Sequence, residues 1–283
     1  MKVLLTGGDG MLATDVRREF TPHHEVVVFP RAELDVTDRA ACRARIAAVR
    51  PDIVINAAGM TNVDACESSR EEAFRVNAEG PGNLAAAATE AGAFVAHYST
   101  DYVFDGSKSG PYVEEDPPNP QGVYARSKLL GEVRVRESAC EHLILRISWV
   151  FGNNGRNFIR TILDAAREQP VLRVVDDQRG SPSYTVDLAA ATRRLVEAGC
   201  RGTYHVTNSG SCTWYELAAR AVEWARLARV RVIAVSTREF PRPAPRPANS
   251  VLDNARLRRE GLPLLRPWRE AAREYVESLR AEP

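Results

Sequence analysis

A tyrosine and a lysine four positions apart are the residues of this sequence best suited to acid–base chemistry. Tyr124 and Lys128 stand in the run YARSK, inside a helix predicted over 123–137, so one helical turn brings both side chains to one face. A tyrosine hydroxyl can protonate a developing alkoxide, and an adjacent ammonium group would lower the pKa of the tyrosine toward working pH. The pair therefore predicts a proton donor for ketone reduction, although a YxxxK run alone is common.

A further hydroxyl group is expected beside this pair. The strand predicted over 93–98 is followed directly by two hydroxyl residues, the second of which is Thr100. In an open parallel sheet, ligands bind outside the carboxyl ends of the strands. Thr100 can donate a hydrogen bond to the reacting carbonyl and polarise it. The predicted catalytic set is therefore Thr100, Tyr124 and Lys128, with Lys128 also bonding the ribose hydroxyls of a nicotinamide cofactor.

A glycine-rich turn near the start of the chain predicts the cofactor site. A short apolar strand over 3–5 leads into Gly7, Gly10 and Ala13, spaced as GxxGxxA, and a helix follows. Gly7 permits a tight turn, and Gly10 lets a pyrophosphate approach the free N–H groups of the helix N-terminus. Such a turn alone is weak support, but its position directly after the first strand strengthens the prediction.

The charge after the second predicted strand indicates which dinucleotide is used. The strand over 25–29 is followed by Arg31, where a strict NAD enzyme usually has an acid for the ribose 2′-hydroxyl. Arg31 can pair with a 2′-phosphate, which favours NADPH with NADH still possible, or it can be a solvated surface cation. Asp35, just before Val36, falls where an adenine amino group can be met, and it can equally cap a helix.

Two other strand ends are predicted on the same rim. The strand over 52–56 is followed by Ala57, Ala58 and Gly59, whose small side chains let the backbone lie against the cofactor. Trp149 ends a strand predicted over 143–150. It can stack on a sugar or base, or it can belong to the core.

Alternating strands and helices position these residues. Short apolar strands alternate with helices through the first half, which is typical of a parallel sheet covered on both faces. The predicted fold class is α/β: a doubly wound Rossmann sheet with a smaller C-terminal α/β substrate-binding domain. We assign 1–150 and about 170–200 to the NAD(P)-binding domain, and about 151–169 and 201–283 to the nucleotide-sugar-binding domain.

The composition narrows the class of protein. The 283 residues are 44% hydrophobic, enough for a sizeable core, and the net charge of +1 gives no general attraction to nucleic acid or membranes. The five cysteines and five histidines show no metal-ligand spacing, so we expect reduced, buried cysteines and no metal site. The apolar start is too short for a signal peptide, and no stretch can span a bilayer, which predicts a cytoplasmic protein.

Six stretches of the sequence together resemble one family. They are residues 56–67, 97–106, 124–132, 146–152, 177–182 and 246–253. They run in family order across nearly the whole chain, and the family is that of the dTDP-4-dehydrorhamnose reductases, which are extended short-chain dehydrogenases/reductases. The resemblance implies hydride transfer from NAD(P)H to C4 of dTDP-4-dehydro-L-rhamnose to give dTDP-L-rhamnose, with Tyr124 protonating the oxygen.

The resemblance also implies ligand contacts. Thr100, Asp101 and Trp149 would contact the sugar. With the residues predicted above, the cofactor-binding set becomes Gly7, Gly10, Met11, Leu12, Arg31, Asp35, Val36, Ala57, Ala58, Gly59, Tyr98, Tyr124 and Lys128. Some family members form magnesium-dependent dimers through acidic side chains, and Asp15 falls where one such acid would lie. The sequence offers no full acidic set, so Mg²⁺ is not predicted and a homodimer stays open.

Three other functions also stay open. Ala13 and the run SPSY at 181–184 depart from the usual family pattern, so the substrate can be another dTDP-4-keto-6-deoxysugar of an antibiotic pathway, such as dihydrostreptose formation. A non-catalytic regulatory subunit resembling the methionine adenosyltransferase β subunit has the same fold, but it would be expected to lose the Thr–Tyr–Lys set or the glycine turn. An epimerase or isomerase of the extended class typically has a longer chain and a third glycine in place of Ala13.

Overall fold

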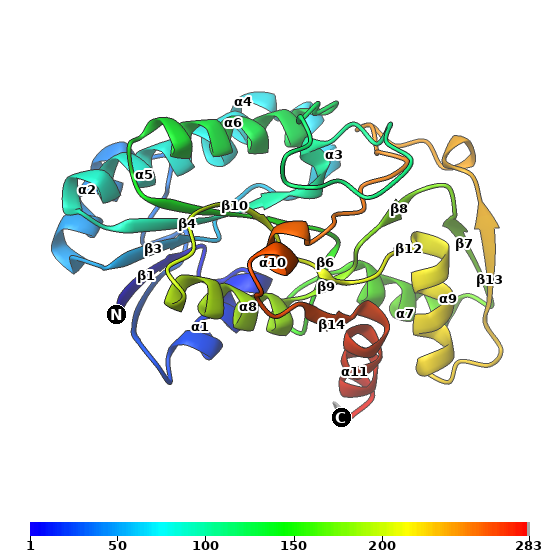
Figure 1. Cartoon of the computed structure of the whole chain (residues 1–283). Coiled ribbons are helices and arrows are strands. Elements are labelled where there is room, and N and C mark those ends of the chain that lie inside the picture. Colours follow the sequence, from blue (N-terminus) through cyan, green and yellow to red (C-terminus); the bar gives the residue numbers. More distant parts are fainter. Residues whose placement is uncertain (282–283) are drawn as a thin grey trace.

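Six parallel strands form the central sheet of the computed structural model, which describes residues 1–281 (Figure 1). They are β1 (Lys2–Thr6), β2 (Glu25–Phe29), β3 (Ile53–Asn56), β4 (Phe94–Thr100), β5 (His142–Ile147) and β10 (Gly202–His205). Their order is β10–β5–β4–β3–β1–β2, and every neighbouring pair is parallel. The strand order reverses beside β1, so the carboxyl ends of β1 and β3 flank the switch point where ligands bind in such sheets.

Helices cover both faces of this sheet, as its apolar strands require. One face carries α1 (Met11–Phe20) and α8 (Thr185–Glu197), and the other carries α2 (Arg39–Val49), α5 (Gly80–Ala91) and α6 (Val123–Glu137) (Figure 1). A hydrophobic core lies on each side of the sheet, and all five cysteines are buried. The predicted doubly wound α/β class is confirmed. Within residues 1–281, no helix has both the length and the apolar character needed to cross a membrane.

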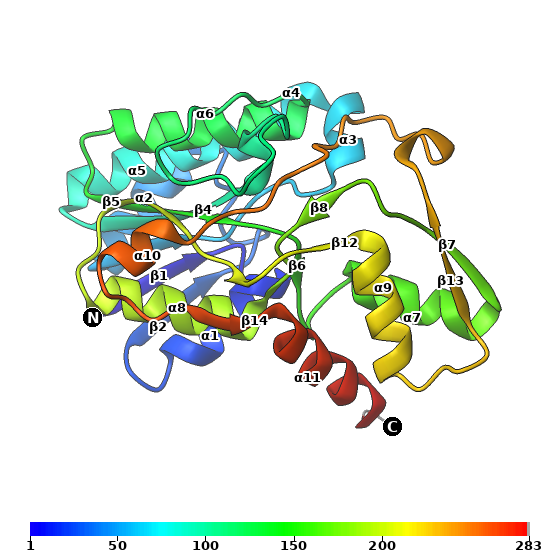
Figure 2. The same cartoon turned by 45° about the vertical axis from the view of Figure 1, so that its right-hand side comes forward.

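The remaining elements lie mostly beside the sheet, where α7, α9 and α11 are grouped (Figure 2). The helices are α7 (Phe158–Glu168), α9 (Trp214–Trp224), α10 (Ala255–Arg259) and α11 (Trp268–Ala281). The strands pair as β6 (Val150–Phe151) with β9 (Ser183–Tyr184), β7 (Val171–Val175) with β13 (Arg231–Val235), β8 (Arg179–Gly180) with β12 (Cys212–Thr213), and β11 (Asn208–Ser209) with β14 (Leu265–Pro267). Short 3₁₀ turns occur at Asp101–Val103 and Thr237–Glu239.

Two strands pair differently from what the assignment of residues to domains suggests. β10 was expected in the substrate-binding part, but it pairs with β5 at the edge of the central sheet. β7 was expected in the cofactor-binding part, but it pairs with β13 away from that sheet. Apolar patterning predicts a strand but does not specify its partner, which explains both differences.

Three local features also differ from the sequence-based prediction. The helix α3 (Val63–Ser68) and the strand β13 were not predicted. The strand expected over 143–150 is broken, because Trp149 takes a left-handed backbone conformation with φ of 43°.

The helix expected over 71–91 contains an irregular turn. It consists of α4 (Arg70–Phe74), a π-helical turn (Arg75–Glu79) and α5. Asn77, in this turn, is buried and its side chain bonds the backbone of Met60 and the hydroxyl of Ser127. The π-helical turn thus carries a side chain that ties α6 to the chain after β3.

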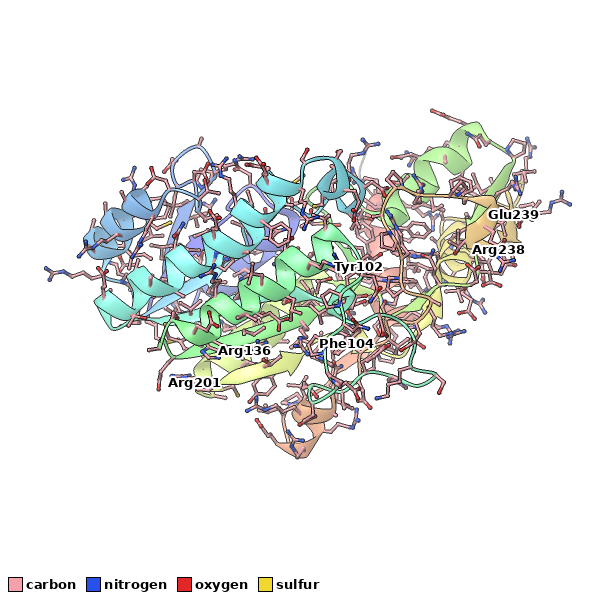
Figure 3. All side chains as sticks on the ribbon, turned by 90° about the horizontal axis from the view of Figure 1, so that it is seen from above. Tyr102, Phe104, Arg136, Arg201, Arg238 and Glu239 are labelled. Carbon is pink, nitrogen blue, oxygen red and sulfur yellow. The ribbon has the colours of Figure 1, made fainter. Side chains whose placement is uncertain are left out.

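A buried ion pair joins α6 to β5. The Glu132 carboxylate accepts bonds of 3.0 and 2.9 Å from Nε and Nη2 of Arg146, and a bond of 2.5 Å from the Ser99 hydroxyl. Arg136, half exposed, also pairs with Glu132. Burial by itself would raise the pKa of Glu132, but the two guanidinium groups outweigh it and hold the pKa below its ordinary value. Figure 3 shows Arg136 and Arg201 near each other along one edge of the molecule, with Tyr102 closer to its middle.

We expect Glu132→Gln to lower the free energy of unfolding by about 3–5 kcal/mol, because it leaves the buried Arg146 guanidinium without its main counter-charge. Urea unfolding followed by circular dichroism measures the loss. The control is Glu141→Gln, since Glu141 pairs with Arg201 at 2.8 Å with side chains 71% and 43% exposed. Such an exposed pair contributes at most about 1 kcal/mol. Equal losses in the two variants would contradict the role given to the buried pair.

Candidate active site

A cavity of about 490 Å³ opens at the carboxyl ends of β1, β3, β4 and β5 and reaches α7 and α9. Twelve of the predicted ligand or catalytic residues line it: Gly10, Met11, Leu12, Ala57, Ala58, Gly59, Tyr98, Thr100, Asp101, Tyr124, Lys128 and Trp149. Lining residues that were not predicted include Thr61, Val63, Tyr102, Arg156, Phe158 and Trp214. The structure therefore brings most of the predicted site together at the edge of the sheet where ligands are expected.

The turn after β1 has the shape of a pyrophosphate cradle. Gly7 has φ of 70°, and a Cβ there would lie 2.8 Å from backbone atoms of Ala57 and Ala58. Gly10 N donates to Gly7 O at 2.8 Å, and a Cβ on Gly10 would lie 3.0 Å from that same oxygen. Gly10 is also the N-cap of α1 and, as a glycine, leaves the first helical N–H groups open to an anion. These features fit the diphosphate of a dinucleotide cofactor.

One buried amide side chain fixes the turn that follows β3. Asn56 Oδ1 accepts from Thr6 Oγ1 at 2.8 Å and from Ala58 N at 3.1 Å. Asn56 Nδ2 bonds Nδ1 of His97 at 3.1 Å, so that ring nitrogen acts as the acceptor. Burial, with further contributions from Lys128 and Arg136, holds the pKa of His97 well below its ordinary value. His97 is therefore a neutral structural residue.

The three predicted catalytic residues meet in the cavity. Tyr124 is partly buried, its hydroxyl interacts with that of Thr100, and its ring lies beside that of Tyr102 at a centroid distance of 5.8 Å. Thr100 Oγ1 also donates to Oδ1 of Asp101 at 3.1 Å. Lys128, on the same helix face as Tyr124, donates from Nζ to the carbonyl of Tyr98 at 2.6 Å. The hydroxyl groups of Thr100 and Tyr124 therefore point at one region of the cavity.

The direction of the Tyr124 pKa differs from the one expected. Burial raises the pKa of Tyr124 above its ordinary value, and the hydrogen bond with Thr100 only partly offsets this. Burial also lowers the pKa of Lys128 to about 8, although Glu132 acts in the opposite direction. Removal from water penalises the charged form of each group, and it is the largest influence on both pKa values. The neutral Tyr124 hydroxyl is accordingly the form that holds a proton for donation.

Three aromatic side chains form the opposite wall of the cavity. Trp149 and Trp214 stack at a centroid distance of 3.4 Å with their planes 4° apart, and Phe158 packs on Trp214 at 4.5 Å. A Cβ on Gly180 would lie 2.2 Å from the Trp149 ring, so the indole has only a glycine behind it. Arg156 lies exposed at the rim. Trp214 was not predicted because it is far from Trp149 in the sequence and begins a helix.

Four predicted cofactor residues do not line the cavity: Gly7, Arg31, Asp35 and Val36. Arg31 is bonded to Glu72, and Val36 is buried against α5. Asp35 accepts a bond from Thr37 N at 2.9 Å, whereas the N-cap of α2 is Asp38, so Asp35 does not cap that helix.

Asp15, the acid considered for metal binding, is hydrogen-bonded to an uncharged side chain. Asp15 is buried on α1 and accepts a bond of 2.5 Å from the Thr185 hydroxyl. In the described part of the chain, no group of three or more His, Cys, Asp or Glu side chains is arranged to hold a metal ion.

The fold and this cavity define a class of protein. A parallel Rossmann sheet, a glycine turn that fits a dinucleotide diphosphate, and a Thr–Tyr–Lys set at the switch point are the features of a nicotinamide-dependent oxidoreductase of the short-chain type. The family model described as the RmlD substrate binding domain matches residues 1–281. The chain belongs to this family, that of the dTDP-4-dehydrorhamnose reductases.

Individual relatives cover the chain almost completely. It is 40% identical to the dTDP-4-dehydrorhamnose reductase of Burkholderia thailandensis, over 99% of each chain. It is 39% identical to a probable dTDP-4,6-dihydroxy-2-methyloxan-3-one 4-ketoreductase of Streptomyces antibioticus, over 100% of this chain and 97% of that protein. A crystal structure of the Bacillus anthracis dTDP-4-dehydrorhamnose reductase in complex with NADP superimposes with a TM-score of 0.95 at 35% identity, over 98% of this chain and 99% of that chain.

We expect the stability of the protein to depend on pH through Asp101. Its carboxyl group is buried and accepts a bond of 2.8 Å from Ser148, and burial raises its pKa from 3.8 to about 6. The folded state therefore binds this proton more tightly than the unfolded state, so the contribution to stability is complete below pH about 4 and is lost as pH rises through about 6. Relative to Asp101→Asn, the wild type should lose roughly 2–3 kcal/mol of unfolding free energy between pH 4 and 8.

The measurement is urea unfolding of both proteins across that pH range. Asp105→Asn is the control whose difference from the wild type should stay nearly constant between pH 4 and 8, because backbone and side-chain hydrogen bonds from Ser107 hold the pKa of Asp105 below its ordinary value. Its wild-type carboxylate stabilises the folded state above pH about 4, the ordinary aspartate pKa. A difference between wild type and Asp101→Asn that does not change with pH would contradict the assignment.

Proposed function

We propose that this chain reduces the 4-keto group of dTDP-4-dehydro-L-rhamnose to give dTDP-L-rhamnose, with NADPH preferred as the reductant and NADH also accepted. The observation that carries the proposal is the pair of hydroxyl groups on Thr100 and Tyr124, which face the same cavity and interact there, with Lys128 one helical turn from Tyr124. This arrangement can hold a ketone oxygen between two donors beside the cradle of a dinucleotide.

The proposed reaction divides the work between cofactor and protein. The bound nicotinamide supplies the hydride that adds to C4. Tyr124 donates its hydroxyl proton to the sugar oxygen as negative charge develops there, and Thr100 donates a hydrogen bond to the same oxygen. Lys128 holds the ribose hydroxyls and, when protonated, stabilises the phenolate that Tyr124 becomes. The turn at Gly7 and Gly10 and the backbone at 57–59 bind the diphosphate and ribose.

The substrate would lie against the aromatic wall. We propose that Thr100, Asp101 and Trp149 contact the sugar. Trp214 stacks on Trp149 and fixes the plane that the ligand meets. Arg156 supplies positive charge at the rim for a diphosphate, which a nucleotide sugar carries. Residues 1–150 and about 170–200 would form the cofactor-binding domain, and about 151–169 and 201–283 the nucleotide-sugar-binding domain, with Trp149 close to the boundary between them.

A second candidate is the reduction of another dTDP-4-keto-6-deoxysugar. The relative from Streptomyces antibioticus favours it, and so does one contact. The unusual run SPSY contributes Ser183, whose backbone N donates to the carbonyl of Trp149 at 3.2 Å. The backbone of this run therefore adjoins the indole that we propose for the sugar site. A regulatory subunit without catalysis is disfavoured, because Thr100, Tyr124 and Lys128 are all in place.

We also propose where the protein acts and what it binds. The protein would act in the cytoplasm on a small molecule, without nucleic acid or a membrane as partner. A homodimer is compatible with the family, and the Thr185 hydroxyl bonded to Asp15 gives no reason to propose a Mg²⁺ requirement.

The proposed reaction is tested by following the absorbance of the reduced nicotinamide with dTDP-4-dehydrorhamnose. We expect Tyr124→Phe to lower kcat by about 10²–10⁴-fold, because it removes the proton donor. The dissociation constant for NADPH should change little. Tyr215→Phe, on α9 and outside the cavity lining, is the matched control and should keep full activity. Cofactor binding without oxidation by the wild type would contradict the sugar assignment, and an active Tyr124→Phe would contradict the proton donor.

A further inference from the structure

The chain after β2 lies directly against the dinucleotide turn. Gly8 N donates to the carbonyl of Phe29 at 3.1 Å, and a Cβ on Gly8 would lie 3.3 Å from the backbone nitrogen of Pro30. Arg31 follows immediately. In a Rossmann sheet, the adenosine ribose of the cofactor lies at the end of the second strand, and the residues there distinguish its 2′-hydroxyl from a 2′-phosphate.

The positive charge of Arg31 is already paired with the carboxylate of Glu72. Oε1 of Glu72 accepts from Nη2 of Arg31 at 3.0 Å, and Oε2 accepts from Nη1 of Arg75 at 3.2 Å. Arg75 also donates from Nη2 to the hydroxyl of Thr37 at 3.2 Å. The Arg31 side chain is 74% exposed, whereas that of Glu72 is only 33% exposed. Glu72 is thus fixed by two arginine partners, whereas the more exposed Arg31 side chain is free to turn toward a ligand.

Asp35 adds a second carboxylate, so the charges of this cluster sum to zero. The pKa of Asp35 is lowered chiefly by its bond with the Thr37 backbone, and the charges of Arg31 and Arg75 contribute as well. Two guanidinium groups therefore face two carboxylates, Glu72 and Asp35. A 2′-phosphate entering this cluster would have to compete with Glu72 for Arg31, whereas a 2′-hydroxyl needs no cation.

We propose that Glu72 is a specificity-determining residue for the cofactor: by pairing with Arg31 and Arg75 it reduces the preference for NADPH and keeps NADH usable. The inference rests on the proposed function only in that the bound ligand is a nicotinamide dinucleotide. It assigns to α4 a role in choosing between two cofactors that differ by one phosphate. Arg31 by itself would favour NADPH strongly, and Glu72 limits that effect.

The test compares Glu72→Gln with the wild type by fluorescence titration with NADH and with NADPH. We expect the ratio of the NADH to the NADPH dissociation constant to rise about 5–20-fold, because Arg31 is released to bind the 2′-phosphate. The gain should shrink at high salt, since the site is exposed. Glu71→Gln, on the neighbouring exposed residue of α4, is the matched control and should leave the ratio unchanged.

A ratio of two dissociation constants does not depend on how much of the protein is folded, so a partly unfolded variant still tests the inference. The double variant Arg31→Gln, Glu72→Gln should lose most of the gain. An unchanged ratio in Glu72→Gln, an equal change in Glu71→Gln, or a full gain in the double variant would each overturn the inference. Because no sugar is used, these results stand apart from the test of the proposed reaction: failure to reduce the sugar would leave the cofactor ratios intact.

Discussion

The side chain of Asn56 occupies the point on which the site depends. Its amide joins the end of β1, the middle of β4 and the turn after β3, through Thr6, His97 and the backbone of Ala58. A buried amide bonded in this way has one arrangement that satisfies its donors and its acceptor, so the three chain segments are held in fixed relation. The close approach of Gly7 to Ala57 and Ala58 requires that relation, and so does the cradle that this approach forms.

Burial determines the protonation of the ionisable side chains in the cavity. It favours the neutral hydroxyl of Tyr124 and lowers the pKa of Lys128 to about 8. A neutral Tyr124 can give a proton to an oxygen that becomes strongly basic, and the protonated form of Lys128 stabilises the charge left behind. The same removal from water favours the protonated form of Asp101, so the stability of the protein depends on pH through this carboxyl group.

The sequence predicted those parts of the site that come from short local patterns. The glycine turn, the pair Tyr124 and Lys128, and the apolar strands each depend on residues within a few positions, so spacing alone reveals them. Trp214 and Glu72 depend on partners far away in the chain, Trp149 and Arg31, and no local pattern predicts such contacts. The strand partners of β7 and β10 were missed for the same reason. The pKa of Tyr124 is raised and not lowered as expected, because the spacing of residues in the sequence does not reveal how deeply a side chain is buried.

The central claim is that the chain moves a hydride from a nicotinamide to C4 of a dTDP-linked keto sugar. The most direct measurement uses NADPH carrying deuterium at both C4 positions of the nicotinamide, with mass spectrometry and proton NMR of the sugar product. We expect one deuterium in the product, at C4 of the sugar, and none at C4 when the deuterium is supplied only by the solvent. A product without deuterium, or with deuterium at another carbon, would contradict the claim.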